Sequence, residues 1–158
     1  MKSFALALDI DGVFLRGKRV LDFAIRTVDR IKKENTPFIF ITNGGGISEE
    51  QKAREMSEKL QTEILPSQIL LSHTPFKKYA KKYAEKRVLV LGREPECVEV
   101  AKMYGFKRAV SVRSIHGEFE DIYPMRKPER LSEMSGPVEA AFVFHDPMDW
   151  ALEVQSAN

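Results

Sequence analysis

The hydrophobic positions of this chain form short runs that alternate with amphipathic segments. Residues Phe4 to Leu8 are nearly all apolar, which is typical of a parallel strand buried on both faces. Segment 21–35 has apolar residues at helical spacing on one side and charged residues on the other, which predicts an amphipathic helix. The following segment TPFIFIT, residues 36–42, predicts a second buried strand. A strand, a helix and a strand in this order predict a right-handed parallel crossover.

The next segments continue the alternation. Ser48 and Gln51 have the spacing of a capping box, which opens a helix that turns Ala53, Met56 and Leu60 inward. Segment 73–86, HTPFKKYAKKYAEK, predicts another helix. A second cycle follows, with predicted strands at 87–92, 108–112 and 138–144, a helix at 94–106 closed by Gly105, and a loop over about 114–137.

Strands and helices alternate throughout, so the predicted class is α/β. At 158 residues the chain has room for one domain, or for one domain and part of a second. We expect a boundary near residues 73–87, where the first cycle ends.

Composition excludes several classes of protein. The chain has 25 basic and 23 acidic residues, so we expect no nucleic-acid and no membrane partner. The basic run 77–87 is interpreted as a solvated helix face. The single cysteine, Cys97, excludes an internal disulfide and is expected to be a buried or idle thiol rather than a nucleophile. Because no apolar run reaches about 18 residues and the first strand begins almost at Met1, we expect neither a membrane span nor a leader, and a cytoplasmic location by default.

Candidate chemistry lies where the first two predicted strands end. Asp9 and Asp11 follow one strand, and Thr42 and Asn43 follow the next. Ligands collect beyond the carboxyl ends of parallel strands. Two close carboxylates repel, and a proton or a hard cation such as Mg²⁺ relieves that repulsion. One carboxylate can then attack phosphorus while the other donates a proton. The alternatives are a turn with a cap at the aspartates and a flexible turn at NGGG, residues 43–46.

These motifs resemble the first two signature motifs of the haloacid dehalogenase (HAD) superfamily. The resemblance is carried by LALDIDGVFLRGK (6–18), FIFITNGGG (38–46), LSHTPFK (71–77) and FHDPMDWALEVQ (144–155). It points to the phosphatases with a type-IIA cap, and within them to the cat eye syndrome critical region protein-like branch. It implies a partial Rossmann-like parallel sheet core in residues 1–75, followed by the first part of an α/β type-II cap in residues 76–158.

The resemblance also implies roles for individual residues. Asp9 would be the nucleophile that forms an aspartyl-phosphate, and Asp11 the general acid and then base. Mg²⁺ would bind the Asp9 carboxylate and the Asp11 backbone carbonyl, while Thr42, Asn43 and Gly44 would hold the phosphate of a small phosphorylated substrate. Relatives with such caps also suggest a homo-oligomer formed through the cap, and relatives in eukaryotes suggest mitochondria as a second location.

Two later motifs of the family are not matched: a lysine near the nucleophile and a second acidic pair that completes the Mg²⁺ site. We therefore expect a truncated chain with impaired activity. One alternative is a compact phosphatase without a cap, in which Asp146 or Asp149 supplies the acidic pair. Another is an inactive fragment that acts as an interaction module. In the cap interpretation, Trp150 belongs to the cap core.

Overall fold

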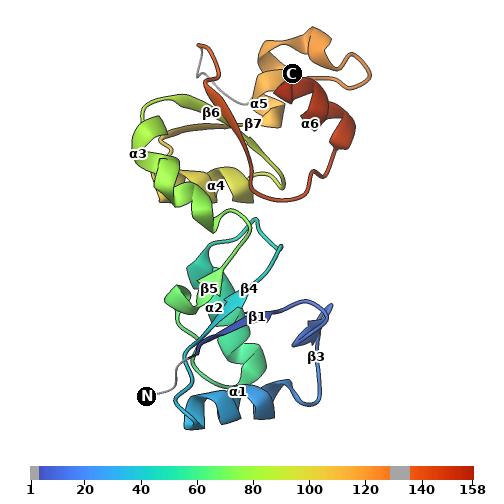
Figure 1. Ribbon diagram of the computed structural model, residues 1–158. Helices are drawn as coiled ribbons and strands as arrows, with labels where there is room; N and C mark the ends of the chain where they lie inside the picture. Colours follow the sequence, from blue (N-terminus) through green and yellow to red (C-terminus); the bar gives the residue numbers. More distant parts are fainter. Residues whose placement is uncertain (1–3, 129–135) are drawn as a thin grey trace. The chain divides into compact units, whose positions relative to one another are not determined.

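The computed structural model describes residues 4–128 and 136–158 and divides the chain into two compact units, Met1–Thr74 and Pro75–Asn158 (Figure 1). Each unit has its own sheet and its own buried hydrophobic residues.

The first unit is built on a parallel sheet of strands β1 (Leu6–Asp9), β4 (Phe38–Ile41) and β5 (Ile69–Leu70), in the order β1-β4-β5. A short hairpin of β2 (Leu15–Arg16) and β3 (Arg19–Val20) follows β1. The crossover from β1 to β4 contains helix α1 (Ala24–Lys33), and the crossover from β4 to β5 contains α2 (Glu49–Leu60) and the 3-10 turn η1 (Pro66–Gln68).

The helices of the first unit cover one face of its sheet. Phe38 and Phe40 point into a cluster with the inner residues of α1 and α2, among them Val28 and Met56. The alternate positions of the strands remain exposed, with Ile39 and Ile41 at 37% each. The prediction that these strands are buried on both faces is therefore wrong within this unit, because both crossover helices pack on the same side.

The second unit is a three-layer arrangement around a sheet in the order β7-β6-β8. Its central strand, β6 (Arg87–Leu91), pairs in parallel with β7 (Arg108–Ser111) and with β8 (Ala140–Val143). Val88 and Val90 face α3 (Ala80–Tyr83) and α4 (Glu96–Tyr104), whereas Leu89 and Leu91 face α5 (Val112–Glu118) and α6 (Trp150–Ala157). Figure 1 shows these helices on the two sides of the sheet.

Several predicted elements are confirmed. Ser48 and Gln51 form the capping box of α2, and Ala53, Met56 and Leu60 are buried. Gly105 ends α4 in the left-handed conformation. Cys97 is buried, as expected.

Other predictions were wrong in detail. The segment predicted as a helix over 73–86 is mainly the 3-10 helix η2 (Thr74–Tyr79), and only four residues form α3. The predicted loop 114–137 contains most of α5 and the turn η3 (Glu120–Ile122); its part 129–135 lies outside the described residues. Trp150 is 63% exposed, because α6 buries Leu152 and Glu153 instead.

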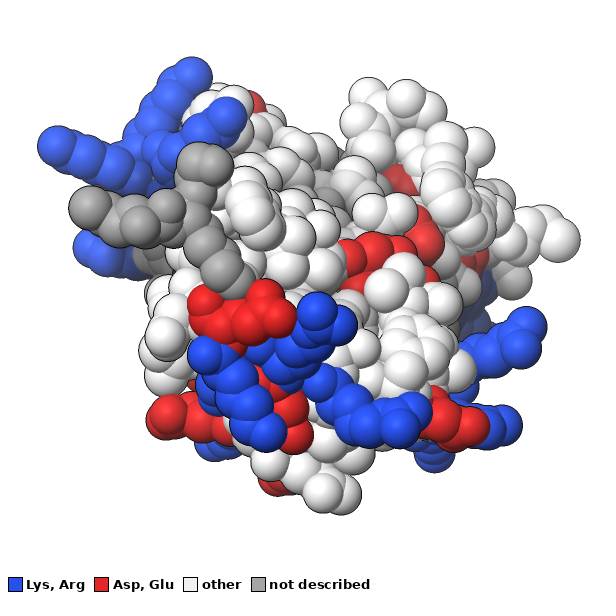
Figure 2. Space-filling view, turned by 60° about the horizontal axis from the view of Figure 1, so that its bottom comes forward, with Lys and Arg blue, Asp and Glu red and all other residues white. Residues whose placement is uncertain are grey.

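No helix in the described part of the chain is long and apolar enough to cross a membrane. Figure 2 shows basic and acidic side chains next to one another over the lower part of one face, with a smaller acidic group set in uncharged surface nearer the centre.

Candidate functional site

The predicted chemistry gathers at the carboxyl edge of the first unit's sheet. The parallel register pairs Asp9 with Ile41, so β1 and β4 end level with each other. Thr42 follows immediately and is buried, with its N–H bonded to Leu70 O of β5 at 3.1 Å. The ends of all three strands therefore meet at one edge, as expected for a ligand crevice in a parallel sheet.

A tight turn after β1 sets the direction of the two aspartates. Leu15 N–H donates to Ile10 O at 3.0 Å, and Gly12 N–H donates to Leu15 O at 2.7 Å. Gly12 has a φ of +85°, a conformation that side chains with a Cβ rarely adopt. The glycine that follows the aspartates is thus required by the reversal of the chain into the hairpin.

Asp11 and Thr42 are in direct contact. The hydroxyl of Thr42 donates to Asp11 Oδ2 at 3.1 Å and accepts the backbone N–H of Gly44 at 3.0 Å. One buried hydroxyl thereby fixes an aspartate carboxylate and the start of the glycine loop, residues 43–46.

Asp9 lies on the same edge with an exposed side chain. Its Oδ1 accepts the N–H of Ile10 at 2.9 Å, which orients the carboxylate. Asn43 is also exposed, directly after the β4 end. The sequence-predicted residues therefore lie on one sheet edge, with Asp11, Thr42 and Gly44 joined by hydrogen bonds.

The donor set fits Mg²⁺, which prefers oxygen ligands and is commonly held by one or two carboxylates together with waters and substrate phosphate. One oxygen each of Asp9 and Asp11 is engaged by the protein's own donors. Among the described residues, no group of three or more His, Cys, Asp and Glu side chains converges on a metal-sized site.

Strand pairing gives the compact alternative without a cap no support. The strand that precedes Asp146 and Asp149, β8, pairs with β6 in the sheet of the second unit and not with β1. Asp149 caps α6 by accepting Leu152 N–H at 3.3 Å and pairs with Arg126 at 3.0 Å. Asp146 is exposed in the loop between β8 and α6.

Sequence reasoning missed the third strand end. β5 is two residues long, and Ser72, His73 and Thr74 follow it at the same edge as Thr42. Ser72 N–H donates to Gly44 O at 3.4 Å, and Thr74 donates to the buried Glu49 at 2.7 Å. The signal was the apolar run 69–71 before SHT, which has the same form as the runs before the aspartates and before Thr42.

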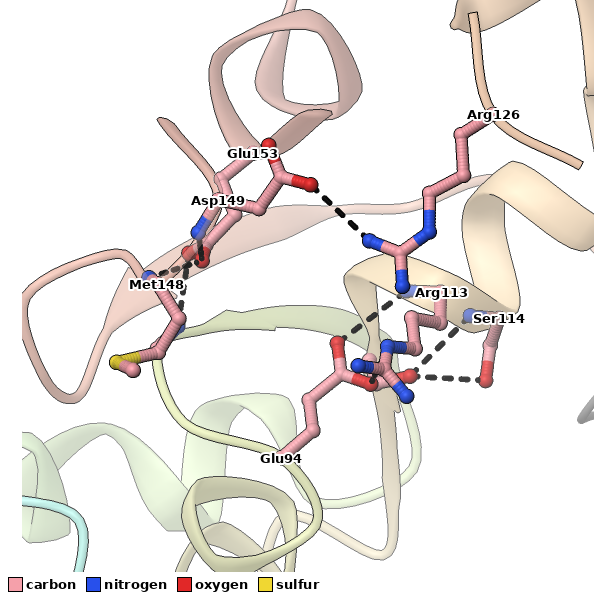
Figure 3. Close-up of polar contacts among 9 residues, drawn as sticks. Glu94, Arg113, Ser114, Arg126, Met148, Asp149 and Glu153 are labelled. Carbon is pink, nitrogen blue, oxygen red and sulfur yellow. Dashed lines mark hydrogen bonds and ion pairs between the residues drawn. The ribbon is translucent and has the colours of Figure 1, made fainter. Parts of the chain in front are cut away.

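The second unit has a separate cleft of about 220 Å³ at the carboxyl ends of its own strands. Figure 3 shows its polar contacts, in which Arg113 faces Glu94 and Arg126 faces Asp149. Glu153 lies deeper and is 4% exposed. Each arginine shown thus faces a carboxylate of the same unit.

Comparison with known proteins identifies a family and a relative that this chain resembles in sequence. The model of the family described as haloacid dehalogenase-like hydrolase matches residues 6–107. A mitochondrial hydrolase of Saccharomyces cerevisiae is 37% identical over 98% of this chain, and the chain covers 46% of that relative. The chain thus spans less than half of the length of this curated relative.

Two solved structures share the fold at low sequence identity. One is described as a possible sugar phosphatase of the HAD superfamily from Cytophaga hutchinsonii, with a TM-score of 0.68 and 16% identity over 95% of this chain and 48% of that one. The other is a glycerol phosphate phosphatase from Mycobacterium tuberculosis in complex with magnesium, with a TM-score of 0.56 and 20% identity over 95% of this chain and 39% of that one.

Proposed function

Because the chain belongs to the haloacid dehalogenase-like hydrolases, we propose that it carries the nucleophile half of a phosphatase site, which hydrolyses a small phosphate monoester through an aspartyl-phosphate. The observation that supports this most is the hydrogen-bonded group Asp11, Thr42 and Gly44 beside the exposed Asp9. The type-IIA phosphatases with a cap are the proposed branch, with the first unit as core and the second as cap.

In the proposed reaction, a carboxylate oxygen of Asp9 attacks phosphorus, and the bond from phosphorus to the ester oxygen breaks. Asp11, protonated at that stage, gives its proton to the leaving oxygen. Asp11 then takes a proton from water, which attacks the phosphorus of the aspartyl-phosphate. Inorganic phosphate leaves, Asp9 is a carboxylate again and Asp11 is protonated again.

The remaining residues have supporting roles. The hydroxyl of Thr42 orients the Asp11 carboxyl group, from which the proton is transferred to the leaving oxygen. Asn43 and the N–H groups of Gly45 and Gly46 are suited to phosphate oxygens, because the Gly44 N–H already donates to the Thr42 hydroxyl. Asp9 and the backbone carbonyl of Asp11 would hold Mg²⁺, which when bound offsets the negative charges of the carboxylates and the phosphate.

Hydrolysis of 4-nitrophenyl phosphate by the purified chain, with and without Mg²⁺, tests the proposal. We expect turnover that requires Mg²⁺ and is lost in Asp9→Asn. Asp22→Asn is the matched control. Asp22 is an exposed aspartate of the same unit, and its exposed ion pair with Arg19 contributes little to the stability of the fold. Equal turnover in Asp9→Asn and the parent chain would refute the assignment of the nucleophile.

A folded chain without any turnover would favour the alternative of an interaction module. The exposed sheet face with Ile39 and Ile41 is the observation behind that alternative. A mitochondrial location is also proposed, supported by the name of the yeast relative. A homo-oligomer formed through the second unit stays a prediction that light scattering after size exclusion can test.

A further inference from the structure

Buried polar side chains flank the glycine loop of the first unit in sequence and also occur in the turn 71–74, which contacts the loop. Thr42, Ser48, Glu49 and His73 are all buried, with Glu49 at 3% and His73 at 0% exposure. Burying a carboxylate costs free energy unless hydrogen bonds and neighbouring charges compensate. The hydrogen bonds that stabilise this cluster therefore also fix the backbone beside the candidate phosphate site.

Thr74 connects two elements through a single hydroxyl. It accepts the N–H of Leu71 at 2.9 Å, which closes the turn after β5, and it donates to Glu49 Oε1 at 2.7 Å. Glu49 is the first residue of α2, where the helix dipole favours a negative charge. The turn 71–74 is thereby attached to the start of the helix that follows the glycine loop.

The same turn holds the middle of the glycine loop. Ser72 N–H donates to Gly44 O, and Gly44 N–H donates to the Thr42 hydroxyl, which in turn donates to Asp11. Hydrogen bonds and short stretches of backbone thus connect Glu49 to the Asp11 carboxylate without a gap.

The glycine loop depends on such external contacts. Its ends are fixed by β4 and by the capping box at Ser48, but residues 44–46 are three consecutive glycines, which have the greatest backbone freedom of any residue type. Catalysis is sensitive to displacements of about 1 Å in groups that orient a substrate. A contact that restrains Gly44 therefore affects how phosphate is held.

We propose that Thr74 and Glu49 are positioning residues, which hold the Gly44 segment in register with Asp11 through the turn 71–74. The inference rests on the proposed phosphatase function and adds to it two residues to which the resemblance assigned no role. Neither residue needs to touch substrate.

The test compares Thr74→Val, which removes the hydroxyl at nearly constant volume, with Thr74→Ser, which keeps it. Thr27→Val is the matched control, because the Thr27 hydroxyl donates to Phe23 O in α1, away from this turn. Three quantities are measured: hydrogen exchange of the amides in 42–48, affinity for inorganic phosphate by calorimetry in the presence of Mg²⁺, and kcat/KM for 4-nitrophenyl phosphate. Circular dichroism checks folding, and Glu49→Gln provides a second variant should Thr74→Val unfold.

We expect Thr74→Val to raise amide exchange in 42–48 and to lower phosphate affinity and kcat/KM by about tenfold each, with Thr74→Ser close to the parent chain. Unchanged exchange and phosphate affinity in both Thr74→Val and Glu49→Gln would overturn the positioning role, even if Asp9→Asn abolishes turnover. If every variant, Asp9→Asn included, keeps the turnover of the parent chain, the proposed function is overturned instead. Amide exchange and phosphate affinity would still decide the role of Thr74.

Discussion

The carboxylate of Glu153 accepts the backbone N–H of Gly92 at 2.9 Å, although 61 positions separate the two residues in sequence. The same carboxylate accepts the N–H groups of Met148 and Asp149, at 2.9 and 3.4 Å. A side chain of the last helix thereby occupies the edge of the second sheet where an anionic ligand often binds in such folds.

Glu153→Gln is expected to destabilise the second unit. Both carboxylate oxygens of Glu153 accept backbone N–H groups, and glutamine replaces one of these oxygens by an NH₂ group, which cannot accept. We expect a loss of about 1–3 kcal/mol in the free energy of unfolding. Trp150, the single tryptophan, lies at the start of the same helix, so its fluorescence in a urea titration reports on this unit. Glu99→Gln on the exposed side of α4 is the control and should stay within about 0.5 kcal/mol of the parent chain.

Gly92→Ala is expected to be more harmful than Gly105→Ala. Both glycines have positive φ, +123° and +106°, so both substitutions strain the backbone. A Cβ at Gly92 would lie 2.9 Å from His145 Cβ, whereas at Gly105 the nearest atom, Ala80 Cβ, is at an ordinary 3.6 Å. We expect a difference of about 1–3 kcal/mol in urea titrations of the two variants. Equal costs would mean that the segment at His145 moves away freely.

Arg87 is buried at the start of β6 and pairs with Glu118, while its Nη1 donates to Gly136 O at 2.6 Å. Glu118→Leu should cost about 3 kcal/mol in unfolding free energy, since it leaves the buried guanidinium of Arg87 without its carboxylate partner. The double variant Arg87→Met with Glu118→Leu should recover most of that loss. A double variant as unstable as Glu118→Leu alone would show that the lost bond to Gly136 causes the damage.

Thr42→Val should lower kcat/KM for 4-nitrophenyl phosphate by about tenfold or more, because Asp11 loses its anchoring donor. Thr42→Ser keeps the hydroxyl and should retain most of the activity. Activity in Thr42→Val equal to that of the parent chain would show that the contact between Thr42 and Asp11 is not needed for turnover.

Cys97 is expected to react slowly with iodoacetamide in the folded chain. Burial raises its pKa from 9.0 to about 11, so at pH 8 about a hundredfold less thiolate is present than in an unfolded chain. Mass spectrometry of alkylation with and without urea measures this. Because the unfolded thiol ionises first as pH rises, this group should also lower the free energy of unfolding between pH 9.0 and about 11. Equal alkylation rates with and without urea would contradict the burial.

The placement of the candidate residues was predictable from sequence as far as regular strand ends determine it. Asp9, Asp11 and Thr42 follow apolar runs whose parallel pairing places them on one edge, and the structure bears this out. The bond from Thr74 to Glu49 was not predictable, because it depends on β5, a strand too short to give a periodic signal.

The fold was predictable in class but not in the burial of each face. Apolar runs in β1 and β4 predict that both faces are covered, yet the helices of the first unit lie on one side only. The cap interpretation predicts Trp150 in the cap core, but Asp149 is the N-cap of α6 and the helix buries Leu152 rather than Trp150.

Strand β6 is bonded along both edges and buried on both faces. Its last four residues, VLVL, are apolar with high β-propensity, the kind of segment that stacks with copies of itself into cross-β aggregates when exposed. At the centre of the sheet it has no free edge to offer a neighbouring molecule. Loss of β7 or β8 from the sheet would therefore convert the most protected strand of the second unit into a seed for precipitation.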